Sequence, residues 1–235
     1  MPFSTLKIIG RVLACLLLAP LLNHSASAQS RSSENSADQP LSPAQTALFD
    51  TPHLANVTKP ETLHYAYHRT GPGSFDDTIS VRVKKVNTDG TRDLSFDYLS
   101  GDHHVAFPEI DSFHGNPVFM LALEHDVSMM HEALKLSAAS LRNRIRGGFV
   151  DAPVTDGTFT LPTGATTPAR IITVEPFAHE ARLERLPSLQ QKTYRFVLAD
   201  AVPGQIAEID IDTPADAGLG APAMSEKISF TGAEP

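Results

Sequence analysis

Apolar and polar residues alternate with a period of two in several segments of this chain, and this pattern limits the folds that it can adopt. In LHYAYHR, Leu63, Tyr65 and Tyr67 alternate with His64 and His68, and DTISVRVKKV and RDLSFDYL continue the pattern. Successive side chains of a β-strand point to opposite faces of a sheet, so each segment predicts a strand with one buried and one solvated face. The sequence NTDGT between the last two segments is typical of a hairpin turn.

The alternation extends beyond this hairpin and predicts a larger antiparallel sheet. HVAF, residues 104–107, is expected to form a fourth strand, and five more are expected in TFTLPT, ARIITVEPF, KTYRFVLAD, IAEIDID and EKISF. Pro203-Gly204 suits a type II turn, and the acidic residues of IAEIDID favour a charged edge strand. We find no repeat and no regular alternation of strands with helices. We therefore predict an α+β fold: a mainly antiparallel curved sheet or partial barrel with a helical pair inserted at about 116–146.

The first residues of the chain predict export. Lys7 and Arg11 precede or interrupt an apolar stretch that ends in VLACLLLAPLL, and an A-x-A site follows at residues 26–28. This order is typical of a signal peptide, and the apolar run is too short to cross a bilayer. We predict a signal peptide at residues 1–28, cleavage near Ala28, and a periplasmic or secreted protein.

The rest of the chain divides into a linker and one domain. Residues 29–42 are polar and poor in apolar side chains, which predicts a disordered linker. Ser42, Pro43 and Gln45 have the spacing of a helix start with a capping box. Residues 43–235 are expected to form a single β-rich domain, which is long enough to bury a core.

Charge and cysteine content exclude several classes of function. The net charge is −8 and there is no basic tract, which disfavours nucleic acid as a partner and charge-driven binding to anionic membranes. Peripheral contact with a membrane through apolar side chains stays open. The single cysteine, Cys15, lies in the predicted signal peptide, so the mature domain is expected to have no disulfide and no thiolate nucleophile. Motifs for phosphate or dinucleotide binding are absent, and we predict no cofactor.

The segment NPVFMLALEHDVSMMHEALKLSAASLRNRIR, residues 116–146, is the most informative candidate site. Its first part is more apolar than a surface helix requires, which favours a wall against a core or a ligand cavity. The predicted ligand-binding residues are Val118, Met120, Leu121, Met129 and Met130, because methionine adapts to irregular apolar surfaces.

The charged residues of the same segment are predicted to join its two helices. Arg142 and Arg146 lie four residues apart on one helix face, where like charges repel unless acidic groups are near. Glu124 and Asp126, in the preceding helix, are the expected partners. We interpret these four residues as helix–helix ion pairs, either fixed or acting as a latch that a ligand could open.

Histidines do not form a recognisable metal motif. HEALK at 131–135 has Lys135 where a second zinc-binding histidine would have to stand, and HEARL at 179–183 fails in the same way. No metal site is therefore predicted, and no G-x-S-x-G nucleophile elbow is present. An enzyme assembled from distant residues stays open, and its expected members are His103, His104, Glu124, Asp126 and His131.

The segments GNPVFMLALEHDV, LRNRIR and DAVPGQIAEIDI resemble a group of small, exported, uncharacterised proteobacterial proteins, over roughly residues 46–212. The group's Asn-Pro start, Leu-Glu-x-Asp segment and arginine-rich run fall here on Asn116-Pro117, residues 123–126 and residues 142–146. His125 stands where that pattern has an arginine. In architecture, the order of strands, helices and strands is similar to periplasmic lipoprotein carriers of the open-barrel type, which implies a sheet holding acyl chains under a helical lid.

Three hypotheses of function follow. The first is a non-enzymatic binding or carrier protein for a hydrophobic or lipid-like ligand. The second is an envelope hydrolase or metal-dependent enzyme that uses the histidines and carboxylates named above. The third is an envelope assembly or structural factor that acts through a protein partner.

Overall fold

The computed structural model describes residues 40–218 and 220–235. The predicted signal peptide and most of the predicted linker lie outside these residues. Within the described part of the chain, none of the helices combines the length and the apolar character that a membrane crossing requires.

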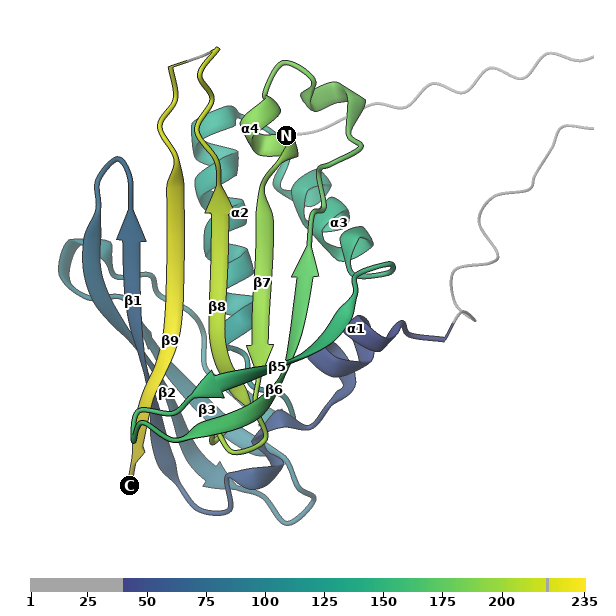
Figure 1. The fold of residues 1–235 in the computed structure, drawn as a ribbon. Helices are drawn as coiled ribbons and strands as arrows, with labels where there is room; N and C mark the ends of the chain where they lie inside the picture. The colour runs from purple at the N-terminus through teal and green to yellow at the C-terminus, as the bar shows by residue number, and fades with distance from the viewer. Residues whose placement is uncertain (1–39, 219) are drawn as a thin grey trace, which may run out of the picture. The chain divides into compact units, whose positions relative to one another are not determined.

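The described residues form one nine-stranded sheet, and helices precede and separate its strands in the sequence (Figure 1). The strands are β1 (Glu61–Thr70), β2 (Phe75–Val86), β3 (Arg92–Tyr98), β4 (Ile110–Phe113), β5 (Val154–Thr160), β6 (Thr166–Val174), β7 (Thr193–Leu198), β8 (Ile206–Thr213) and β9 (Met224–Glu234). The α-helices are α1 (Pro43–Gln45), α2 (Val118–Leu134), α3 (Ala138–Gly148) and α4 (Pro187–Gln190). Short helices are η1 (Thr46–Asp50), η2 (His53–Asn56), η3 (Gly101–His103) and η4 (Ala181–Leu183).

The sheet is open and entirely antiparallel, in the order β4-β3-β2-β1-β9-β8-β7-β6-β5. The chain runs outward from β1 to the edge at β4, crosses through α2 and α3 to the opposite edge at β5, and returns inward to β9. The first and last strands therefore pair in the middle, with Tyr65 opposite Phe230. The predicted α+β class is confirmed, and so is the helical pair, which is inserted in the sequence between two strands of the sheet.

Two details of the predicted sheet are wrong. The fourth strand is β4, not HVAF, whose Val105 makes only an isolated bridge to Tyr98. The segment IAEIDID forms β8, which lies between β7 and β9 rather than at an edge. Its acidic side chains are instead paired across the strands, because Arg195 of β7 contacts both Glu208 and Asp210 at 2.8 Å.

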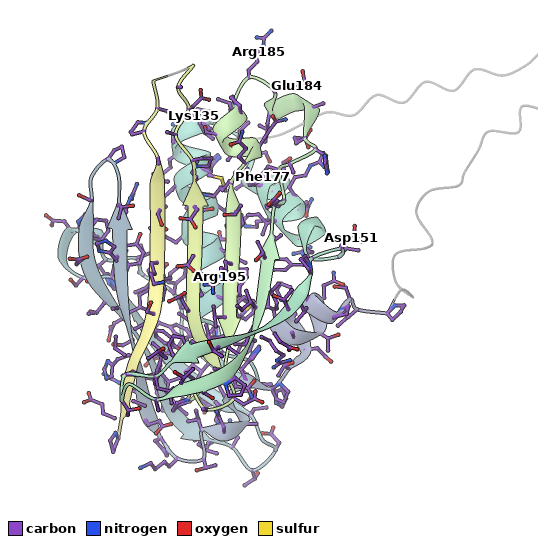
Figure 2. All side chains as sticks on the ribbon, in the orientation of Figure 1. Lys135, Asp151, Phe177, Glu184, Arg185 and Arg195 are labelled. Atoms are coloured by element: carbon purple, nitrogen blue, oxygen red, sulfur yellow. The ribbon has the colours of Figure 1, made fainter. Side chains whose placement is uncertain are left out.

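The core lies between α2 and one face of the sheet. We call this face of the sheet the inner face. Tyr65, Ile79, Tyr194 and Phe196 are fully buried there. In Figure 1, α2 runs behind β7 and β8 along this face. Figure 2 shows Arg195 toward the viewer, on the opposite face, as the alternation along β7 requires.

Local polar contacts fix where the helices begin and end. The predicted capping box is present at α1, with Ser42 and Gln45 each bonded to the other's backbone N–H. The Asn116 side chain accepts a hydrogen bond from the Val118 N–H at 3.1 Å and so caps the start of α2. Lys135 ends α2 in the left-handed conformation, with its N–H bonded to the His131 carbonyl.

The predicted turn at Pro203-Gly204 is also present and is tied to the start of α2. The Gln205 N–H donates to the Val202 carbonyl at 2.8 Å, and Gly204 has φ +76°, as the third position of a type II turn requires. The buried Asn116 amide donates to the Gly204 carbonyl and to the Tyr65 hydroxyl. One side chain thus connects the turn, the central strand β1 and helix α2.

Candidate functional site

The inner face of the sheet changes from apolar to polar toward one end of its central strands. Along β1 the inward series passes from Leu63 through two tyrosines to Arg69, and along β9 it passes from Phe230 through Ile228 to Glu226. Beside them, Thr213 ends β8 and Lys192 directly precedes β7. The second half of α2 covers this polar layer, so charged groups lie where a sheet–helix interface is normally apolar.

Asp126 of α2 makes the best-satisfied polar contact of this layer. Its carboxylate accepts hydrogen bonds from Lys192 Nζ at 2.8 Å and from the Tyr194 hydroxyl at 2.6 Å. Both charged side chains are 1% exposed, and Lys192 also donates to Thr213 Oγ1 at 3.1 Å. Burial, followed by the neighbouring Asp126 charge, raises the pKa of Tyr194 well above its usual value, so this hydroxyl stays a donor.

Arg69 lies in the same layer and has weaker partners. Its two terminal nitrogens contact only sulfur in the described residues: Met129 Sδ at 3.4 Å and Met224 Sδ at 3.1 Å. Its Nε is buried, has no hydrogen-bond partner among residues 40–218 and 220–235, and lies 3.8 Å from Glu226 Oε1, beyond hydrogen-bonding distance. Thioether sulfur is a weak acceptor, so the guanidinium is left with unused donor capacity.

Glu226 is a buried carboxylate with an unsatisfied oxygen. The residue is 2% exposed, and its Oε1 has no hydrogen-bond partner among the described residues. Burial, and then repulsion by Asp126, raises its pKa above the ordinary value. The hydroxyls of Tyr67 and Tyr98 are buried in the same layer, and the Glu226 charge raises the pKa of both beyond the effect of burial.

A pocket of about 250 Å³ opens onto this polar layer at the C-terminal end of α2. Most of its wall is apolar and includes Met129, Met130, Leu134, Leu186, Leu189 and Met224. The polar lining residues are Ser188 and, at the base, Arg69, Asp126, Lys192 and Thr213. Because three methionines line it, we call it the methionine pocket. Figure 2 shows Lys135, Glu184 and Arg185 at this end of the sheet.

The structure separates the five predicted ligand-binding residues. Val118 and Leu121 are buried in the core between α2 and the sheet. Met120 is half-buried and lines a different hollow, of about 500 Å³, beside Phe49 and Phe113. Met129 and Met130 line the methionine pocket.

The four predicted ion-pairing residues also divide. Glu124 of α2 and Arg142 of α3 form an ion pair, with Arg142 Nε 2.8 Å from Glu124 Oε2. Asp126 points to the sheet and pairs with Lys192 instead of an arginine of α3. Arg146 is exposed and makes no ion pair within the described residues. Only one contact of this kind therefore joins the two helices.

The Glu124–Arg142 pair is expected to contribute little, because its side chains are 40% and 45% exposed. Replacing Glu124 with glutamine should cost about 0.5 kcal/mol at pH 7 and less at high salt. Hydrogen bonding to Arg142 lowers the pKa of Glu124 below 4.5, so the contribution is full above that value and disappears as pH falls through the folded-state pKa. Urea unfolding at pH 7 and pH 3 measures the difference.

Glu132→Gln is the matched control for this prediction, because Glu132 is an exposed carboxylate of the same helix and makes no ion pair among the described residues. It should change the free energy of unfolding less than Glu124→Gln does. A cost for Glu124→Gln that did not vary with pH would contradict the interpretation.

The histidines and carboxylates of the enzyme hypothesis do not converge. His103 stacks on Phe75 with ring centroids 3.8 Å apart, and His131 Nδ1 bonds to the Leu136 carbonyl at the end of α2. His104 Nδ1 lies against the Leu99 carbonyl. In the described part of the chain, no group of three or more histidine, cysteine or acidic residues could hold a metal ion.

Sequence reasoning missed Arg69, Lys192 and Glu226, although a signal for each was present. Arg69 follows Tyr65 and Tyr67 at the same two-residue interval, so the strand pattern already placed it on the inner face. The same interval connects Lys192 to Tyr194 and Glu226 to Ile228. Reading the alternation past the last apolar residue would have identified all three.

The protein therefore has an α+β fold in which an open antiparallel sheet carries helices over one face and has a small, mostly apolar pocket with a charged base. The chain matches no family model and no curated protein. Among solved structures it is similar to the crystal structure of the Mycobacterium tuberculosis lipoprotein LppX, with 13% identity and a TM-score of 0.30, over 76% of this chain and 89% of that chain.

Proposed function

We propose that this protein binds a small hydrophobic or lipid-like ligand in the methionine pocket and does not alter it chemically. One observation carries the proposal: the pocket has a mostly apolar wall and a base of charged groups. Ligand sites in proteins typically combine an apolar lining with a few polar groups that fix orientation. Met129, Met130 and Met224 suit a flexible apolar ligand, because methionine adapts its shape.

The size of the pocket limits what it can hold. Its volume of about 250 Å³ is slightly below the range of roughly 300–1,000 Å³ that is typical of small-ligand sites. We therefore propose one short apolar chain, or one end of a longer lipid, as the occupant. The signal-peptide pattern of residues 1–28 supports a periplasmic or secreted site of action.

Blocking the mouth of the pocket should abolish binding. Ala133 lines the pocket and is exposed, so a tryptophan can be introduced there without disturbing the core. We expect Ala133→Trp to weaken binding of N-phenyl-1-naphthylamine, a neutral apolar fluorophore, by at least about tenfold, since a filled pocket loses its apolar contacts. Fluorescence titration measures the dissociation constant.

Ala139→Trp provides the matched control, because Ala139 is an exposed alanine of α3 that does not line the pocket. This variant should bind the fluorophore as the unchanged protein does. Equal binding by both tryptophan variants would place the fluorophore elsewhere and would refute the proposed site.

A further inference from the structure

We infer that the ligand of the methionine pocket is an anionic amphiphile, whose charged group binds the Arg69 guanidinium while its apolar chain lies against the methionines. This inference rests on the proposed function and adds to it the chemical class of the ligand and the residue that recognises it. The reason is that the two cations at the base of the pocket, Lys192 and Arg69, differ in the strength of their hydrogen bonds to other groups of the protein.

Lys192 has strong internal partners and Arg69 does not. Lys192 donates to the Asp126 carboxylate and to Thr213, so its charge is compensated inside the protein. Among the described residues, the terminal nitrogens of Arg69 hydrogen-bond only to the sulfurs of Met129 and Met224, and both methionines line the pocket. An arginine can donate two parallel hydrogen bonds to a carboxylate or phosphate, and thioethers cannot replace these acceptors.

The position of Arg69 directs this unused capacity toward the ligand. Its side chain is 21% exposed, whereas Lys192 is 1% exposed. An entering anion would replace the two sulfur contacts and would leave the Asp126–Lys192 pair intact. The apolar wall formed by the methionines would then surround the first part of the alkyl chain.

Glu226 is the internal group that an entering anion must compete with. It lies directly opposite Arg69 on the neighbouring strand, yet the nearest ion-pair contact, Arg69 Nε to Glu226 Oε1, is 3.8 Å. The Glu226 carboxylate therefore neutralises Arg69 only loosely, and its Oε1 has no hydrogen-bond partner in the described part of the chain. If Arg69 binds the charged group of the ligand, removing the Glu226 charge should not weaken anion binding. If Arg69 only supports Glu226, removing either residue should have the same effect.

Calorimetric titration of the full chain with three probes tests the inference. Octanoate, octanol and octyltrimethylammonium have unbranched chains of nearly equal length and differ in the charge of the head group. We expect octanoate to bind at least about tenfold more tightly than octanol, as a charge-assisted pair of hydrogen bonds provides. Octyltrimethylammonium should bind more weakly than octanol.

Variants assign the selectivity to a residue. Arg69→Gln should bind octanoate and octanol equally, and Arg69→Lys should keep part of the preference because it retains the charge without the bidentate geometry. Glu226→Gln should bind octanoate at least as tightly as the unchanged protein. Arg82→Gln is the control, because Arg82 is an exposed arginine of β2 outside the pocket, and it should change nothing.

The outcomes separate this inference from the proposed function. Equal binding of octanoate and octanol to the unchanged protein would overturn the inference and leave an apolar binding site. Tighter binding of the cationic probe, or loss of the octanoate preference in Glu226→Gln, would also overturn it. Failure of all three probes to bind would count against the proposed function itself. The comparison of probes on the unchanged protein stands even if Arg69→Gln does not fold.

Discussion

Replacing Asp126 with alanine is expected to destabilise the protein by about 3–5 kcal/mol, because the substitution leaves a buried lysine without its counter-ion. Lys192 and Asp126 are each 1% exposed, so water cannot compensate the ammonium group in place of the carboxylate. The Tyr194 hydroxyl, which donates to Asp126 at 2.6 Å, loses its acceptor in the same step. Equilibrium unfolding in urea, followed by circular dichroism, measures the loss.

A double-mutant cycle tests whether the cost belongs to the pair. Lys192→Met should also destabilise the protein, because it leaves the Asp126 carboxylate buried with only the tyrosine. The double variant should lose much less than the sum of the two, with a coupling of about 2 kcal/mol or more, since it removes both charges together. Additive losses would show that the two residues stabilise the fold independently.

Asp76→Ala provides the comparison with an exposed carboxylate. Asp76 contacts His68 on the surface, and its side chain is 80% exposed. This variant should cost less than about 1 kcal/mol. A loss below that value for Asp126→Ala would contradict the assignment of Asp126 as a buried partner of Lys192.

Replacing Gly204 with alanine is expected to cost about 3 kcal/mol or more. Gly204 has φ +76°, a conformation that costs other residues roughly 1–2 kcal/mol. An added Cβ would lie 2.7 Å from Asn116 Nδ2 and 2.8 Å from Leu63 Cδ1, so it must displace the buried amide. That amide donates to Tyr65 and to Gly204 itself, and losing these bonds leaves buried polar groups unsatisfied.

Gly73→Ala separates the backbone effect from the packing effect. Gly73 has φ +65° in the turn between β1 and β2, and an added Cβ there meets no atom within 4 Å. It should therefore cost only about 1–2 kcal/mol, from the backbone conformation alone. Thermal and urea unfolding of both variants give the comparison, and equal losses would mean that Asn116 adjusts without cost.

The parts of the fold that could be predicted from the sequence are those that depend on a local pattern of residues. Alternation predicts strands wherever one face is buried and the other solvated, and the capping residues predict the start of α1. The fourth strand was misplaced because Val105 and Phe107 satisfy the alternation without a full ladder to pair with. The order of strands was not predictable from alternation, because it depends on which edges meet after the helices cross the sheet.

The candidate site was harder to predict because it consists of residues that break the pattern. Arg69 and Glu226 occupy inward positions at which an apolar residue is normally expected, and they are opposite each other although far apart in the chain. Arg142 and Arg146 are the arginines near Asp126 in the sequence, whereas its partner Lys192 follows 66 residues later, directly before β7. Local spacing cannot reveal a contact that only the complete sheet creates.

Pairing of β1 with β9 in the middle of the sheet has a consequence for how the chain folds. During synthesis β1 is made early, and its partner on one side is made last. Until β9 arrives, both β1 and β8 present unpaired backbone edges, which are the usual sites of strand exchange and aggregation. Contacts between such distant segments also slow folding. The centre of this sheet, rather than its edges, is therefore the last part of the sheet to be completed.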